Sequence, residues 1–187
     1  VGRDFVRELQ TEGAGVSDVY REAIRRGQSI AAEKRFFHWD LEFPEAYVDL
    51  PSSAWKPKEE QGFHAVVGNP PYDVLSTEEL EVDVSADLSF FRSANVYAPA
   101  IRGKVNLYKL FICRALALGT QQGTTSMIVP MALLGDDQAR DVREVLLSRR
   151  LVAVECFPQK DDPHQRVFPQ AKLATAVFAT ALEQRES

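Results

Sequence analysis

The sequence predicts an α/β fold with a mostly parallel sheet and an antiparallel last strand. Between residues 63 and 157, apolar runs of strand length alternate with segments of helical periodicity, and a further apolar run covers residues 172–180. The resulting order is strand, helix, strand, helix, strand, strand. Helical crossovers connect parallel strands, whereas two successive strands joined by a loop favour antiparallel pairing.

Composition limits the classes of protein to which the chain can belong. Its 187 residues, 45% hydrophobic and 26% charged, suffice for one globular core. No apolar run has the length of a transmembrane helix and no segment resembles a signal peptide, so we expect a cytoplasmic protein without membrane contact. The net charge of −5 disfavours a free-standing nucleic-acid binder, because cationic side chains supply most non-specific affinity for phosphate.

The first 50 residues differ in pattern from the rest. We expect residues 1–50 to form a helical N-terminal segment, separate from residues 51–187. Apolar residues among charges predict an amphipathic helix over residues 18–35, interrupted near Gly27. Residues 51–62 are rich in proline, serine and glutamate, which predicts a loop.

The first strand of the sheet is predicted at residues 63–67. The segment from Asp73 to Gly103 follows with weak periodicity and five acidic residues between Glu78 and Asp87. A connection of this length is typical of a solvated surface excursion or of a lid that closes over a substrate. Because acidic side chains repel phosphate, we expect it to be partly disordered.

Two helices and three strands are predicted in the second half. Apolar residues recur at helical spacing from Leu107 to Leu118, and Gly119 is placed to end that helix. The acidic side chains of Asp136 and Asp137 suit the N-terminus of a second amphipathic helix, through Leu146. The strands are expected over residues 124–129, 151–157 and 172–180.

Both cysteines are predicted to lie in the core. Cys113 falls inside the apolar helix and Cys156 at the end of a strand. Nothing places the two thiols as a disulfide, and buried cysteines commonly act as small hydrophobic residues.

The tetrapeptide Asn69-Pro70-Pro71-Tyr72 is the most informative motif, and it directly follows the first predicted strand. Ligands of open α/β sheets lie at the carboxyl ends of strands. The Asn69 side-chain oxygen and the Pro70 carbonyl can each accept one N–H of a planar amino group, which localises the lone pair on its nitrogen. Two prolines stiffen the loop.

Tyr72 offers a flat aromatic face against which a planar base can stack. Such stacking is worth roughly 1–3 kcal/mol per base. A nucleobase is therefore the favoured guest of this loop. The structural alternative is a Pro-Pro turn that only ends the strand, with Tyr72 at its rim.

The tetrapeptide after an apolar strand resembles the catalytic motif of N6-adenine-specific DNA methyltransferases, as in fused type II restriction-modification enzymes and related phage-defence methylases. Four further segments resemble the same family in the same order: residues 37–45, 106–111, 124–130 and 167–172. The resemblance runs from about residue 36 to residue 180. It implies that residues 51–187 are the C-terminal half of a Rossmann-like methyltransferase domain.

The resemblance also implies a reaction and its participants. The methyl donor would be S-adenosylmethionine and the substrate double-stranded DNA with a flipped adenine. Asn69, Pro70, Pro71 and Tyr72 would form the catalytic loop. Phe168 would contact the extruded adenine from the face away from Tyr72. No metal is implied.

The donor site of this family is not apparent in the sequence. It would need a glycine-rich turn after a buried strand, upstream of the tetrapeptide. The best candidate is Gly13-Ala14-Gly15, but the charged residues before it do not resemble a buried strand, which favours a helix–helix connection. If a front half is missing, strand 63–67 has an open edge that N-terminal helices or another chain would cover.

Other readings of the motifs stay open. His38 and Asp40 would point to one side of a strand, but two ligands do not make a metal site. No lysine follows an acid at the spacing of metal-dependent nucleases. Asn106 suits a helix cap and Tyr108 the core.

The alternative functions are methylation of a protein glutamine or an RNA base, and a binding or scaffold piece without activity.

Overall fold

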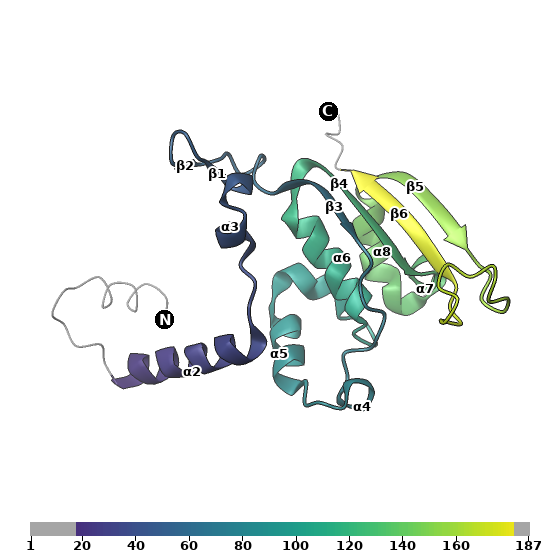
Figure 1. Cartoon of the computed structure of the whole chain (residues 1–187), viewed down its shortest axis with the longest axis horizontal. Coiled ribbons are helices and arrows are strands. Elements are labelled where there is room, and N and C mark those ends of the chain that lie inside the picture. Colours follow the sequence, from purple (N-terminus) through teal and green to yellow (C-terminus); the bar gives the residue numbers. More distant parts are fainter. Residues whose placement is uncertain (1–17, 182–187) are drawn as a thin grey trace. The chain divides into compact units, whose positions relative to one another are not determined.

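The computed structural model describes residues 18–181 of the chain (Figure 1). Two compact units, Val1–Pro44 and Glu45–Ser187, are distinguished by their internal contacts. Among the described residues, the first unit is helical and the second contains all the strands. No helix in this part of the chain is long and apolar enough to span a bilayer.

The described part of the first unit begins with helix α2, Asp18–Lys34. It is continuous, so the predicted interruption near Gly27 is wrong. A glycine inside a helix costs roughly 0.5–1 kcal/mol relative to alanine. The surrounding alanine, arginine and glutamate residues are good helix formers.

A short helix, α3 (Trp39–Glu42), follows in the same unit. The rings of Phe37, Trp39 and Phe43 pack on one another, with the closest centroids, those of Phe37 and Trp39, 4.9 Å apart. Asp40 lies in this helix and His38 at its start. The two side chains therefore do not alternate along a strand, the arrangement in which they would share one side.

The second unit is built on a four-stranded sheet of order β3-β4-β6-β5. Its strands are β3 (Phe63–Gly68), β4 (Gly119–Pro130), β5 (Arg150–Phe157) and β6 (Thr175–Ala181). β3 and β4 are parallel, whereas β6 runs antiparallel to both of its neighbours. This confirms the α/β class and the antiparallel last strand. The pattern did not predict that β6 inserts between β4 and β5.

Two helices connect the strands and pack against the sheet (Figure 1). Helix α6, Leu107–Leu118, contacts β3 and β4, and helix α8, Arg140–Leu147, contacts β5. Both were predicted. Gly119 follows α6 with φ −75°, an extended conformation, because the chain enters β4 at once. The short helices α7 (Ala132–Gly135) and η3 (Asp137–Ala139) precede α8.

The connection from Asp73 to Gly103 is folded rather than an open loop, which corrects the prediction. It contains α4 (Thr77–Leu80), α5 (Ser85–Ser93) and η2 (Asn95–Ala100). It also contributes buried residues to the core, namely Leu75, Val84 and Ala100. Its short helices depend on this tertiary packing, because segments of this length are not stable alone.

A small hairpin precedes the sheet, formed by β1 (Val48–Asp49) and β2 (Ala54–Trp55). The predicted loop over residues 51–62 therefore includes one short strand. The helix η1 (Pro44–Ala46) comes before the hairpin.

The two thiols have different environments. Cys113 is 5% exposed within α6 and belongs to the core, as predicted. Cys156 is exposed, so the prediction that it is buried is wrong. The reason is topological: β5 pairs with β6 alone and lies at the edge of the sheet.

Candidate active site

The tetrapeptide lies where β3 ends. Because β3 and β4 are parallel, their carboxyl ends meet at the same edge of the sheet, with Gly68 opposite Met127. Asn69 is exposed at this edge, whereas Pro70 is buried. A buried proline with fixed φ anchors the loop, and the asparagine before it faces solvent.

The hydroxyl of Tyr72 ties the loop to the end of β4. It lies 3.2 Å from Oδ1 of Asn69 and 3.3 Å from the carbonyl oxygen of Ile128. The hydroxyl has one proton and donates to one of these oxygens at a time. Burial raises the pKa of Tyr72 above its ordinary value of 10.0, so the phenol remains a donor at neutral pH.

The chain after Tyr72 is fixed by backbone hydrogen bonds to the segment before α6. Leu75 N–H donates to the Val105 carbonyl over 2.8 Å, and Leu107 N–H donates to the Asp73 carbonyl over 2.9 Å. Val74 N–H donates to Oε2 of Glu79, 2.7 Å away. The tetrapeptide is therefore held at both of its ends.

Phe168 is brought to Tyr72 by the loop that connects β5 and β6. The two ring centroids are 6.3 Å apart with an interplanar angle of 67°, an edge-to-face contact. Both residues are half-buried. A planar base can enter between these rings only when one of them turns or moves aside.

Three of the predicted site residues are thus assembled from two distant segments: Asn69, Tyr72 and Phe168. Asn106 lies at the N-cap of α6, as predicted, but its side chain makes no capping hydrogen bond. Tyr108 is 4% exposed and belongs to the core, again as predicted.

Sequence reasoning missed two groups: one acceptor at the site and one buried lysine in α6. The Ile128 carbonyl is a backbone atom, and no side chain marks it as an acceptor. Lys109 is fully buried, and its ammonium donates to the carbonyls of Arg102 and Gln138 at 2.8 and 3.1 Å. A lysine in a helix gives no sequence signal of such burial.

The candidate donor turn, Gly13-Ala14-Gly15, lies outside the described residues. Within residues 18–181 no glycine-rich turn follows any strand of the sheet: β3 leads into the tetrapeptide, β4 into Met131 and β5 into Pro158. These residues do not fit a nucleoside-binding turn. Over the same range, no cluster of three histidine, cysteine or acidic side chains could hold a metal ion.

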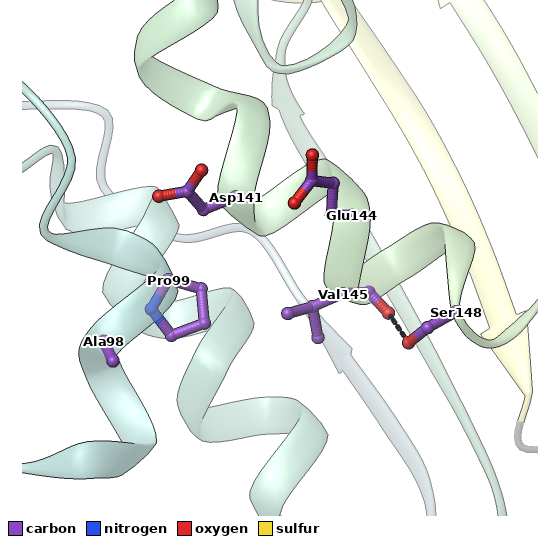
Figure 2. A pocket seen from close by; sticks show the side chains of 6 residues that line it. All are labelled: Ala98, Pro99, Asp141, Glu144, Val145 and Ser148. Atoms are coloured by element: carbon purple, nitrogen blue, oxygen red, sulfur yellow. Dashed lines mark hydrogen bonds between the residues drawn. The ribbon is translucent and has the colours of Figure 1, made fainter.

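A hollow of about 500 Å³ lies between η2 and α8 (Figure 2). Its lining residues are Ala98, Pro99, Asp141, Glu144, Val145 and Ser148. The polar groups among them already have partners within the chain. Arg102 and Arg140 pair with Asp141 and Glu144 at 3.5 and 2.9 Å, and the Ser148 hydroxyl donates to the Val145 carbonyl. No residue of the tetrapeptide lines this hollow.

A smaller hollow of about 270 Å³ lies beside the chain that follows the tetrapeptide. Val74 and Leu75 form part of its wall, together with Glu79, Arg92 and Lys104. A concave surface that carries both acidic and basic side chains therefore lies next to the candidate site.

Comparison with known proteins gives one family match. A sequence model of the Eco57I restriction-modification methylases matches residues 7–156. No curated protein matches the chain.

Similar solved structures are methyltransferases and restriction-modification enzymes. One is the methyltransferase subunit of a type I restriction-modification system from Streptococcus thermophilus, with 17% identity, 73% of this chain and 26% of that chain covered, and a TM-score of 0.49. Another is a nuclease-deletion mutant of the type ISP enzyme LlaGI with a DNA substrate mimic, with 13% identity, coverage of 69% and 12%, and a TM-score of 0.49. The chain spans about a quarter of the first and an eighth of the second.

Proposed function

Because the chain belongs to the Eco57I restriction-modification methylase family, we propose that it carries the catalytic loop of an S-adenosylmethionine-dependent methyltransferase acting on adenine N6 in DNA. The chain covers 26% or less of the two matched enzymes described above. The proposed activity is therefore that of a larger protein in which this chain is one part.

The observation that carries the proposal is the convergence of an exposed amide and two aromatic rings at one edge of the sheet. Asn69 Oδ1 and the Pro70 carbonyl would each accept one hydrogen of the adenine amino group. This draws the nitrogen lone pair out of the ring system and makes it a nucleophile. Tyr72 and Phe168 would hold the flipped base from its two faces.

The loop contributes orientation as well as charge stabilisation. The hydrogen bond from Tyr72 to the Ile128 carbonyl, and those that fix Asp73 and Leu75 directly after the loop, hold its position before any substrate binds. A preorganised acceptor needs no reorganisation during the reaction, which is the main advantage of such a site over water.

S-adenosylmethionine is the proposed donor and would supply an activated methyl group on its sulfonium. Residues 18–181 do not fit its nucleoside-binding turn, so that part of the site would come from other residues of the whole protein. The sheet leaves room for such residues: within residues 18–181, β3 is paired on one side only, and Val67 on it is 80% exposed. A further strand, from the same chain or a second one, would cover this edge.

Substitution of Asn69 tests the proposal in a protein that contains this chain together with its donor site. N69A should lower DNA methylation by about 10²–10³-fold, the usual effect of losing one preorganised polar group. The measurement is transfer of labelled methyl groups to DNA, followed by digestion to identify N6-methyladenine.

Asn95, an exposed asparagine at the start of η2, provides the matched control. N95A should leave methylation unchanged. Retained activity in N69A would contradict the assigned role. Transfer of the labelled methyl groups to protein or RNA, and not to DNA, would support one of the two alternative substrates.

A second candidate function is a non-catalytic scaffold, because the described residues lack a donor turn. Calorimetry of the 187-residue chain with S-adenosylmethionine separates the cases. We expect no binding by this chain alone and binding by the whole protein. Tight binding by the chain alone would show that its own residues complete the donor site.

A further inference from the structure

The loop that carries Phe168 contains neither helix nor strand. It runs over residues 158–174, between β5 and β6. Local turns order most of its backbone, such as the hydrogen bonds from Gln165 N–H to the Asp162 carbonyl and from Ala171 N–H to the Phe168 carbonyl, and its last residue, Ala174, accepts a hydrogen bond from Met131 N–H. These bonds shape short stretches and do not connect the beginning of the loop to its end.

Arg166 makes that connection. One guanidinium nitrogen donates to the Pro169 carbonyl over 3.1 Å, and the other terminal nitrogen donates to the Asp161 carbonyl over 3.3 Å. A planar guanidinium with donors in a fixed fork suits two acceptors from different segments. The side chain is half-buried and its Nε is buried, so the guanidinium lies within the loop rather than extending into solvent.

The carbonyls of Asp161 and Pro169 lie on either side of Phe168 in the sequence. Pro169 follows Phe168 directly, and Asp161 lies near the start of the loop. Lys172 pairs with the Asp161 side chain at 3.1 Å, but both groups are about 70% exposed, so this bridge contributes little. Arg166, by contrast, is partly buried, and its hydrogen bond to the Pro169 carbonyl fixes the backbone next to Phe168.

We propose that Arg166 is a positioning residue that holds Phe168 against Tyr72 and so builds one wall of the base pocket. The catalytic part of this inference rests on the proposed function. The contact between the Phe168 and Tyr72 rings, which Arg166 would maintain, does not depend on that function. The competing role for an arginine beside DNA is direct neutralisation of a phosphate. Lys160 allows the two roles to be separated, because it is an exposed cation in the same loop.

The first test follows the Tyr72 ring protons by NMR in the 187-residue chain. F168A removes a neighbouring aromatic ring and should shift these resonances. R166Q should shift them in the same direction, whereas K160Q should leave them at the wild-type position. R166K keeps the charge, but its single ammonium cannot reproduce the fork, so its shift should lie in between. Wild-type resonances in R166Q would overturn the proposal.

The second test is a double-mutant cycle of DNA methylation in the whole protein. F168A should lower the specificity constant about 5- to 150-fold, as expected for the loss of one base stack of roughly 1–3 kcal/mol. If Arg166 acts through Phe168, R166Q should lower it by no more than F168A does, and R166Q/F168A should be no worse than F168A alone.

Two outcomes of the cycle have different meanings. The losses from R166Q and F168A could instead add, with R166Q weakening DNA binding more at low salt than at high salt. This result would indicate that Arg166 contacts a phosphate and would overturn the proposal. Absence of any methylation by the wild-type protein would contradict the proposed function instead, and the NMR comparison would still decide the role of Arg166.

Discussion

Tyr72 links the proposed catalytic loop to its surroundings through its ring and through its hydroxyl. Its ring contacts Phe168, while its hydroxyl bonds to Asn69 or to the Ile128 carbonyl. A substrate amino group would compete with this hydroxyl for Oδ1 of Asn69. The ring and the hydroxyl can be separated by substitution.

We predict that Y72F and Y72A have very different effects. Y72F keeps the ring and frees the Asn69 oxygen, so methylation should change less than tenfold. It should cost about 0.5–1.5 kcal/mol of folding stability, the net worth of one hydrogen bond. Y72A removes the stacking face and should lower methylation about 5- to 150-fold. Methylation assays and urea unfolding of the same variants provide the measurements.

Equal losses in the two variants would contradict a stacking role. They would indicate that the hydroxyl matters more than the ring. Stability data are needed for both variants, because the hydroxyl also fastens the loop to β4.

At the residue scale, sequence reasoning located the loop but not its contacts. Asn69 and Tyr72 could be singled out because an amide and an aromatic ring after a strand suit the chemistry. Phe168 was linked to Tyr72 only through the family resemblance, since its spacing gives no information about contact across a sheet edge. The roles assigned to these residues remain predictions.

Among the elements, α6 buries three titratable side chains, those of Tyr108, Lys109 and Cys113. Burial raises the pKa of Cys113 from 9.0 to about 11 and that of Tyr108 from 10.0 to about 12. Burial also lowers the pKa of Lys109 below 10.5. In each case burial makes the charged form less stable in the folded protein than in the unfolded chain.

The consequence is a predicted loss of stability in alkali. Between about pH 9 and 11 the unfolded chain releases the Cys113 proton while the folded chain keeps it, so the free energy of unfolding falls as pH rises. Tyr108 adds to the fall from about pH 10, whereas Lys109 opposes it. Urea unfolding at pH 8 and pH 10.5 measures the difference.

The variant C113A isolates the thiol contribution. Its stability should fall less between these two pH values than that of the wild type, whatever its stability at pH 8. The matched control is C156A, which removes the exposed thiol and leaves Cys113 in place, so its stability should still fall through Cys113 as the pH rises. An identical slope in all three proteins would refute the assignment to Cys113.

Elements with strong periodicity were predictable and short ones were not. The apolar faces of α6 and α8 are evident in the sequence, and both helices form where expected. Helix α5, by contrast, has no fully buried residue, and its neighbours α4 and η2 are only one or two turns long. Their stability comes from the core they contact, and local sequence does not encode that contact.

At the scale of the molecule, β3 is an edge strand of the sheet that the described residues form. An edge strand presents unpaired backbone groups to any other strand in solution. Val67 adds an exposed apolar side chain to this edge. We therefore expect the 187-residue chain to self-associate when it is studied alone.

A charge at this position should suppress association. V67K should lower the weight-average mass measured by sedimentation, because an edge lysine disfavours strand pairing. V82K is the matched control, since Val82 is 58% exposed but lies outside the sheet. If V82K reduces association as much as V67K does, a general charge effect would explain the result and the edge would not.

The placement of β6 between β4 and β5 has a consequence for biosynthesis. On a ribosome, β4 and β5 emerge first, but neither can pair with the other, because the strand that separates them is made later. Until β6 inserts, β5 has no hydrogen-bonding neighbour and the Phe168 loop has no fixed end. Nascent chains that stop short of residue 175 should therefore expose β5 to chaperones and proteases, and the aromatic pair would close only once the insertion is complete.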